Sequence, residues 1–194
     1  ILDGLVGSEM CIRDRVKTIY NNIFKVRVND DDEKGGCTFV GGAWKDVSTD
    51  DLFKDRKVVL FGLPGAFTPT CSSEQLPTYD QEYDKFKSLG IDEVYCISVN
   101  DAVVMNAWAR DLGIKNVKMI PDGDGAFTRS LGMLINKPLQ GFGMRSWRYS
   151  ALIDNKEIVQ FNEEPGMNNL SLDDDPYTVS DPNTMLKYLG FQPN

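Results

Sequence analysis

Three short apolar runs alternate with two helix-like stretches in the middle of this chain, and this order constrains the fold most. The runs are Lys57–Phe61, Glu93–Val99 and Val117–Ile120, and their length and apolar character are typical of buried strands. Ser72–Leu89 shows helical periodicity, and the pair Asn100-Asp101 is typical of the start of a second helix. Pro77 should kink the first helix or mark its first turn. A β-α-β-α-β succession favours an α/β domain with a sheet covered by helices.

On either side of this core the sequence predicts further strands and short helices. Phe24–Val28 alternates apolar and polar residues, as a half-buried strand does. Trp147–Ile153 and Glu157–Phe161 are predicted to form a hairpin around Asp154-Asn155. The whole pattern predicts an α/β, thioredoxin-like fold in which a mixed central sheet is flanked by helices. The other expected elements are a strand at Trp44–Val47, a helix through Phe53 capped by Ser48–Asp51, a helix at Ala126–Leu131, surface loops at Asn29–Gly36 and Glu163–Asp175, and a last helix from Asp181-Pro182 to Leu189.

Composition and charge restrict the class of protein. A chain of 194 residues with 41% hydrophobic and 26% charged residues fits one globular domain with a substantial core. The net charge of −8 argues against a nucleic-acid partner or an anionic membrane surface. No apolar run approaches the roughly 18 to 20 residues of a membrane span. The chain has 4 cysteines and no CxxC pair, which suggests a reducing compartment, so we expect a cytoplasmic location.

The first fifteen residues differ in character from the rest. Leu5–Arg15 has no clear amphipathic period and resembles one reading frame of a common sequencing-library adapter. The alternative is a genuine but irregular N-terminus. We therefore expect residues 1–15 to be foreign and residues 16–194 to form a single domain. A targeting signal would then be missing from this sequence, so an organellar destination stays open.

The chain contains no histidine, which excludes Ser-His-Asp and Cys-His catalysis. It also removes the commonest zinc and iron ligand, and we expect no metal or other cofactor. The segment Pro64–Cys71 places Cys71 where a buried strand gives way to a helix. Backbone N–H groups and the helix dipole favour an anion there, and the thiolate is the reactive form of cysteine. Without histidine, a cation such as arginine must assist the backbone.

The pattern Pro64-x-x-x-Thr68-x-x-Cys71 resembles the active-site signature of peroxiredoxins. The longer segment Leu60–Ser72 is similar to the type II, or peroxiredoxin-5-like, subfamily. Ser98–Asp101, Pro121–Gly123 and Gly141–Ser150 resemble the same subfamily and follow in the same order, so the resemblance covers roughly residues 17 to 190.

This resemblance implies a role for each matched residue. Cys71 is the peroxidatic cysteine, whose thiolate attacks a hydroperoxide and becomes a sulfenic acid. Arg148 is the guanidinium that contacts sulfur and peroxide, with Arg145 as the nearest rival. Thr68 offers a hydroxyl that hydrogen-bonds the peroxide while accepting from the backbone. Pro64 shapes the loop and shields the thiolate from water.

The resemblance leaves the route of reduction open. Cys96 follows Cys71 by 25 residues, which matches a resolving cysteine in plant-like relatives, yet its apolar strand favours a buried, inert thiol. A Cys71–Cys96 disulfide would require the first turn of the helix to unwind. Asn168–Leu172, where some relatives carry a resolving cysteine, has none, and Cys37 matches no family role. We therefore expect an external thiol reductant, either glutathione with glutaredoxin or thioredoxin, and the family implies a homodimer.

Other interpretations of the same residues remain. Cys71 could be a structural thiol, Arg148 a surface cation and Thr68 a helix N-cap. A disulfide oxidoreductase on this fold would need a second cysteine where Thr68 stands. A peroxide sensor or holdase module would oxidise Cys71 without turnover. The acidic cluster Asp173–Asp175 is interpreted as a solvated loop, because the spacing of an EF-hand calcium site is absent.

Overall fold

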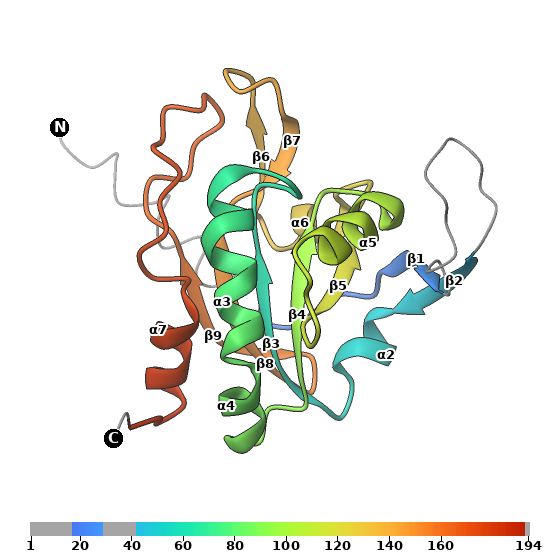
Figure 1. The fold of residues 1–194 in the computed structure, drawn as a ribbon, viewed down its shortest axis with the longest axis vertical. Coiled ribbons are helices and arrows are strands. Elements are labelled where there is room, and N and C mark those ends of the chain that lie inside the picture. Colours follow the sequence, from blue (N-terminus) through green and yellow to red (C-terminus); the bar gives the residue numbers. More distant parts are fainter. Residues whose placement is uncertain (1–16, 29–41, 193–194) are drawn as a thin grey trace, which may run out of the picture.

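A five-stranded mixed sheet forms the centre of the molecule (Figure 1), in a computed structural model that describes residues 17–28 and 42–192. Its strand order is β5-β4-β3-β8-β9. Strands β3, β4 and β5 run parallel, whereas β8 is antiparallel to both β3 and β9. The fold class predicted from the sequence is therefore confirmed. The strands are β3 (Lys57–Gly62), β4 (Glu93–Ser98), β5 (Lys118–Pro121), β8 (Tyr149–Asp154) and β9 (Glu157–Glu163).

The alternation of side chains along β3 divides the core into two layers. Val58 and Leu60 point to one face of the sheet and Val59 and Phe61 to the other, as the two-residue period of a strand requires. The second face packs against α3 (Leu76–Gln81), α4 (Tyr83–Ser88), α5 (Ala102–Asp111) and α7 (Pro182–Tyr188). The first face packs against α2 (Thr49–Phe53), α6 (Ala126–Ser130) and β1 (Ile23–Val28).

Local sequence signals account for several element boundaries. Ser48 caps α2 in a reciprocal capping box with Asp51, and Asp101 caps α5 by accepting from Val103 N and Val104 N. Asn155 and Lys156 both have positive φ (45° and 69°), which gives the tight turn between β8 and β9. These elements lie where the sequence predicted them.

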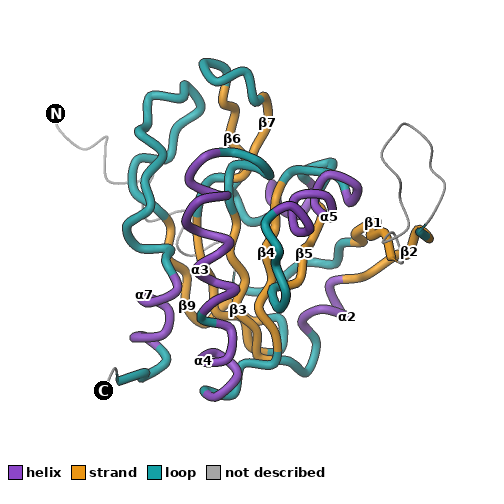
Figure 2. Tube along the Cα trace, in the orientation of Figure 1, coloured by secondary structure: helices purple, strands orange, loops and turns teal. Residues whose placement is uncertain are grey.

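Two small antiparallel sheets complete the fold (Figure 2). The first pairs β1 with β2 (Ala43–Ser48); both strands were predicted from the sequence, but their pairing was not. The second pairs β6 (Leu134–Lys137) with β7 (Gly143–Ser146), and the sequence analysis did not predict it. Each of these strands has only four residues, too short for alternation to stand out from the surrounding loop. The predicted turn at Asn29–Gly36, Cys11 and Cys37 lie outside the described residues.

The long helix expected at Ser72–Leu89 is divided into three parts. It begins with helical residues Pro69 and Thr70, continues as a π-helical turn, η1 (Cys71–Gln75), and then becomes α3. Pro77 has no N–H to donate to the preceding turn, and Leu76 N–H instead bonds the Cys71 carbonyl five residues back. Pro77 thus marks the first turn of α3, one of the two roles expected for it. A further break at Glu82 (ψ 1°) separates α3 from α4.

One long connection crosses the end of the sheet. Residues 164–181, called here the late loop, join β9 to α7 and rise beside the β6–β7 hairpin (Figure 1). Within the described part of the chain, no helix combines the length and apolar character needed to cross a membrane.

Candidate active site

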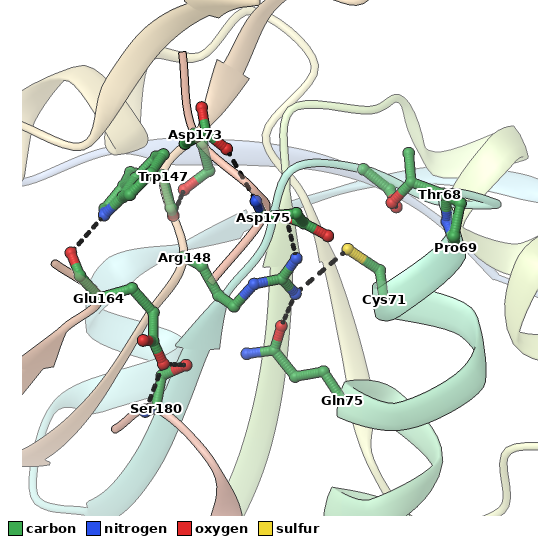
Figure 3. Close-up of polar contacts among 12 residues, drawn as sticks. Thr68, Pro69, Cys71, Gln75, Trp147, Arg148, Glu164, Asp173, Asp175 and Ser180 are labelled. Carbon is green, nitrogen blue, oxygen red and sulfur yellow. Dashed lines mark hydrogen bonds and ion pairs between the residues drawn. The ribbon is translucent and has the colours of Figure 1, made fainter. Parts of the chain in front are cut away.

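Cys71 lies at the start of the helix that follows the central strand β3 (Figure 3). The strand ends at Gly62, where a Cβ atom would stand 2.2 Å from the ring of Tyr149. Glycine is thus required for the chain to leave the sheet beside β8. The Thr68 carbonyl accepts from Ser72 N at 3.0 Å, so the helix begins directly after Thr68 and has Pro69 in its first position. Cys71 is within the first turn and is 0% exposed.

Arg148 brings a buried positive charge to this cysteine. It is 1% exposed and precedes β8, and its Nη1 lies 3.5 Å from Cys71 Sγ. The same nitrogen donates to Gln75 Oε1 at 2.5 Å, one helical turn after Cys71. Burial alone would lower the pKa of Arg148, but the Cys71 thiolate and Asp175 raise it, so the guanidinium stays charged. The geometry therefore supports a thiolate paired with arginine in a water-poor site.

The late loop covers the other side of this guanidinium. Arg148 Nη2 donates to Asp175 Oδ1, and the Tyr177 ring lies 5.7 Å from the guanidinium carbon. Tyr177 OH also contacts Thr78 Oγ1 at 3.2 Å, which joins the loop to α3. Burial raises the pKa of Tyr177 to about 12, so it stays neutral.

The acidic cluster in this loop is not the solvated loop predicted from the sequence. Asp173 is 4% exposed and pairs with Lys137 Nζ at 2.6 Å, while Asp175 pairs with Arg148. Asp174 is exposed, and the side chain of Asp175 keeps 39% exposure on its outer side. Two basic side chains distant in sequence hold these carboxylates, which local charge patterning could not reveal. The described residues contain no group of three or more Cys, Asp or Glu side chains that could hold a metal ion.

Thr68 and Pro64 shape the loop in front of the cysteine. Pro64 is buried, and Thr68 is half-buried beside the Cys71 end of the helix. The Thr68 hydroxyl donates to the Gly65 carbonyl at 2.8 Å. From the sequence we expected this hydroxyl to accept from the backbone, but its described bond to the backbone is a donated one. Because its proton is used by Gly65, the hydroxyl oxygen remains an acceptor for a peroxide proton.

Arg145 also packs against the loop that carries Pro64 and Thr68. Its Nε donates to the Phe142 carbonyl at 3.1 Å and its Nη1 to the Val99 carbonyl at 3.2 Å. A Cβ atom on Gly65 would stand 3.1 Å from Arg145 Nη1, so the guanidinium packs against the loop. Burial lowers the pKa of Arg145, and the Cys71 charge opposes this shift. Its described hydrogen bonds go to backbone carbonyls, whereas those of Arg148 go to Cys71, Gln75 and Asp175.

Cys96 lies in the middle of the sheet, in the apolar layer that also contains Cys71. It is 0% exposed on β4, in register with Phe61 on β3 and Met119 on β5. Burial and the nearby Cys71 charge raise the pKa of the Cys96 thiol well above its ordinary value. Cys71 and Cys96 are both free thiols. The structure thus has the buried, protonated cysteine that the apolar strand indicated.

Three polar residues at this site were not predicted to belong to it. Gln75 lies four positions after Cys71, so helical spacing alone puts both on one face. Asn100 was assigned only a helix start, but its Oδ1 accepts from Ala66 N at 3.0 Å and fixes the active-site loop. Asp175 is 27 residues from Arg148, and no local pattern pointed to their contact.

The fold and the site together define a thiol-based redox protein, and comparisons with known proteins agree. The Redoxin family profile matches residues 37–177. A peroxiredoxin of Rhizobium etli is 51% identical over 166 residues, which cover 86% of this chain and 90% of the relative. Among solved structures, the Plasmodium falciparum antioxidant protein, a 1-Cys peroxiredoxin, has a TM-score of 0.80 at 34% identity and covers 89% of this chain and 97% of its own. Reduced Prx3 of Vibrio vulnificus in complex with hydrogen peroxide has a TM-score of 0.72 at 33% identity, with 90% and 98% covered.

The chain therefore belongs to the peroxiredoxins of the Redoxin family. The relatives support a thiol-dependent peroxidase activity for it.

Proposed function

We propose that this peroxiredoxin reduces hydrogen peroxide and small organic hydroperoxides at Cys71 and that an external thiol restores the cysteine. The observation that carries the proposal is the contact between buried Arg148 Nη1 and Cys71 Sγ at 3.5 Å, at the first turn of a helix. A guanidinium and a helix N-terminus both favour the thiolate. The hydrogen peroxide complex of the Vibrio vulnificus relative supports the choice of substrate.

The chemistry follows from the groups present. The Cys71 thiolate attacks the terminal oxygen of the hydroperoxide, an S–O bond forms and the O–O bond breaks. Sulfur loses two electrons and becomes a sulfenic acid, while the departing alkoxide or hydroxide takes a proton from solvent and leaves as alcohol or water. Arg148 stabilises the negative charge as it moves from sulfur to oxygen. The Thr68 oxygen, free to accept, orients the peroxide proton.

Burial of Cys96 supports reduction by an external thiol. A thiol must be deprotonated to attack the sulfenic acid, and the pKa of Cys96 is raised by burial. Cys96 is also held in register between β3 and β5, so it cannot move without breaking the sheet. A first external thiol condenses with the sulfenic acid to a mixed disulfide and water, and a second releases Cys71. Glutathione with glutaredoxin, or thioredoxin, supplies these thiols.

A reductant panel tests this function. Purified protein is mixed with hydrogen peroxide and with glutathione plus glutaredoxin, or with thioredoxin and its reductase, and peroxide loss is followed. We expect continuous turnover with at least one system, and none in Cys71→Ser. Peroxide loss that stops after one equivalent with every reductant would instead indicate a sensor or holdase.

Cys96→Ala separates an external from an internal resolving thiol. We expect this variant to turn over like the wild type, because the external thiol does not use Cys96. Mass spectrometry after one equivalent of peroxide should show Cys71 oxidised without a Cys71–Cys96 disulfide. Loss of turnover in Cys96→Ala together with that disulfide in the wild type would identify Cys96 as the resolving residue.

A homodimer is part of the proposal. The family resemblance predicts that the surface around the active-site loop meets a second copy. Five large apolar side chains are exposed on that loop, the β6–β7 hairpin and the late loop: Phe67, Leu139, Met144, Leu170 and Leu172. Analytical ultracentrifugation should show a dimer that Leu139→Glu weakens. A monomer at all concentrations would contradict this.

A further inference from the structure

The charge balance at Arg148 changes during the proposed reaction. The guanidinium is 1% exposed and has two anionic partners, the Cys71 thiolate and Asp175. When Cys71 forms a mixed disulfide with a reductant, its negative charge is gone. A buried cation without a partner costs several kcal/mol. Some group must therefore balance Arg148 in the steps in which the sulfur is neutral.

The late loop is folded so that Asp175 can do this. Asp175 has a left-handed backbone conformation (φ 54°), which aspartate tolerates better than most residues. Its N–H donates to Asp173 Oδ1 at 3.1 Å, and Asp173 is anchored by the buried Lys137. The Lys137 ammonium in turn lies 5.2 Å from the ring centre of Trp147, the residue that directly precedes Arg148.

A second anchor fixes the far end of the loop. The buried Glu164 carboxylate accepts from backbone N–H groups of residues 178–180 and from the hydroxyls of Thr178 and Ser180. Glu164 N donates to the Arg148 carbonyl at 3.1 Å, and its own carbonyl accepts from Trp147 Nε1 at 2.7 Å. The loop that carries Asp175 is thus anchored on one side by Lys137 and on the other by Glu164, which is bonded to the Arg148 backbone (Figure 3).

We propose that Asp175 is the permanent counter-ion of Arg148, which neutralises and positions the guanidinium in every state in which Cys71 carries no charge. The inference rests on the proposed function, because it requires Cys71 to alternate between anionic and neutral forms. Asp175 is a positioning residue, since its described contact is with Arg148 and not with the sulfur.

This role has two opposite consequences for the site. With Asp175 present, part of the positive charge of Arg148 is already balanced, so the thiolate is stabilised less than a lone guanidinium would stabilise it. With Asp175 neutralised, the thiolate becomes the single anion beside Arg148 and takes over as its partner. The neutral form of Cys71 then leaves the buried cation without one. The cost of losing Asp175 must therefore depend on the charge of Cys71.

A double-mutant cycle tests this dependence without any turnover. The wild type, Asp175→Asn, Cys71→Ser and the double variant are unfolded in urea at pH 7, with Cys71→Ser as the neutral form of the site. Asparagine keeps the acceptor oxygen and tolerates the left-handed backbone, so only the charge changes. We expect Asp175→Asn to raise the unfolding constant roughly tenfold more in the Cys71→Ser background than in the wild type.

The exposed neighbour Asp174 provides the control. Asp174→Asn should change the unfolding constant equally in both backgrounds. If Asp175→Asn also has the same effect in both backgrounds, its role is only to fold the loop, and the inference is wrong. Since peroxide turnover is not measured here, this failure is distinct from failure of the proposed peroxidase.

The pH dependence of Cys71 alkylation gives a second readout, which also serves if the double variant does not fold. The charged or titratable groups at the site are Arg148, Arg145 and Cys96 around the sulfur, and Asp175 and Tyr177 around the guanidinium. We expect Asp175→Asn to shift alkylation of Cys71 to lower pH and Asp174→Asn to leave it unchanged. An unchanged profile, or a shift to higher pH, would overturn the inference, because an Asp175 that only holds Arg148 in place would give that result.

Discussion

Replacement of Arg148 should slow oxidation of Cys71 by about two orders of magnitude. At 3.5 Å and an effective dielectric constant of about 20, the attraction between guanidinium and thiolate is about 5 kcal/mol. Water that enters the vacated space recovers part of this, and we expect a net loss of about 3 kcal/mol. At about 1.4 kcal/mol for each factor of ten, the rate constant should fall roughly 10²-fold. This matches the usual cost of removing one preorganised donor.

The assay is stopped-flow fluorescence of the reduced protein mixed with excess hydrogen peroxide. Trp108 Nε1 donates to Ser72 Oγ at 3.0 Å, so a tryptophan reports on the residue next to Cys71. Arg148→Met removes the charge and keeps the apolar stem. Arg148→Lys keeps the charge and should recover only part of the rate, because one ammonium cannot replace the planar contacts to Cys71, Gln75 and Asp175.

Arg145→Met is the matched control. It removes a second guanidinium near the site, but one whose described hydrogen bonds go to the Phe142 and Val99 carbonyls. We expect less than a tenfold loss of rate, caused by a looser active-site loop. If Arg145→Met slows oxidation more than Arg148→Met does, or if Arg148→Met retains more than a tenth of the wild-type rate, the electrostatic argument is refuted.

Two further substitutions test the loop and its anchor. Thr68→Val should lower the peroxide rate constant at least tenfold because the acceptor for the peroxide proton is lost, while Thr68→Ser should restore it; equal rates in both would exclude that role. Burial raises the pKa of Glu164, but its hydrogen bonds lower it by more, so the pKa in the folded protein lies below the ordinary value. The stability that Glu164 contributes is therefore present above the unfolded pKa near 4.3 and is lost as the pH falls through the lower folded pKa. Glu164→Gln should thus cost about 2 to 3 kcal/mol in urea unfolding at pH 7 and lose this part of the acid dependence; an unchanged acid dependence would contradict the assignment.

Sequence reasoning reached those parts of the fold that local patterns encode. The apolar runs gave the three parallel strands, and the capping residues Ser48 and Asp101 gave two helix starts. It missed β6 and β7, because four residues are too few for an alternating pattern to stand out from the surrounding loop. It also treated residues 72–89 as one helix, although Pro77 itself signalled a boundary. Proline excludes a regular hydrogen bond but does not say whether the helix kinks, restarts or widens into a π turn.

The residues of the site also fall into those that a local pattern could reveal and those that it could not. Cys71 and Arg148 were reached through motifs, and Gln75 could have been reached through its helical spacing. Asp175 could not, because its role arises only when the late loop folds back onto Arg148. In the sequence its acidic neighbours resemble an ordinary solvated segment. The charge of a loop residue carries no information about its partner until the tertiary structure provides one.

The burial that favours the thiolate also restricts its reduction. Cys71 is 0% exposed, so a glutathione or thioredoxin sulfur cannot reach it in the fold described here. The segment that follows is irregular: Cys71–Gln75 is π-helical, Leu76 N–H bonds the Cys71 carbonyl five residues back, and Pro77 supplies no N–H to the turn before it. An irregular turn at the end of a helix opens at lower cost than the central strand that holds Cys96. We therefore expect the oxidised sulfur to become accessible by local opening of residues 69–76, while Arg148 stays in place with Asp175.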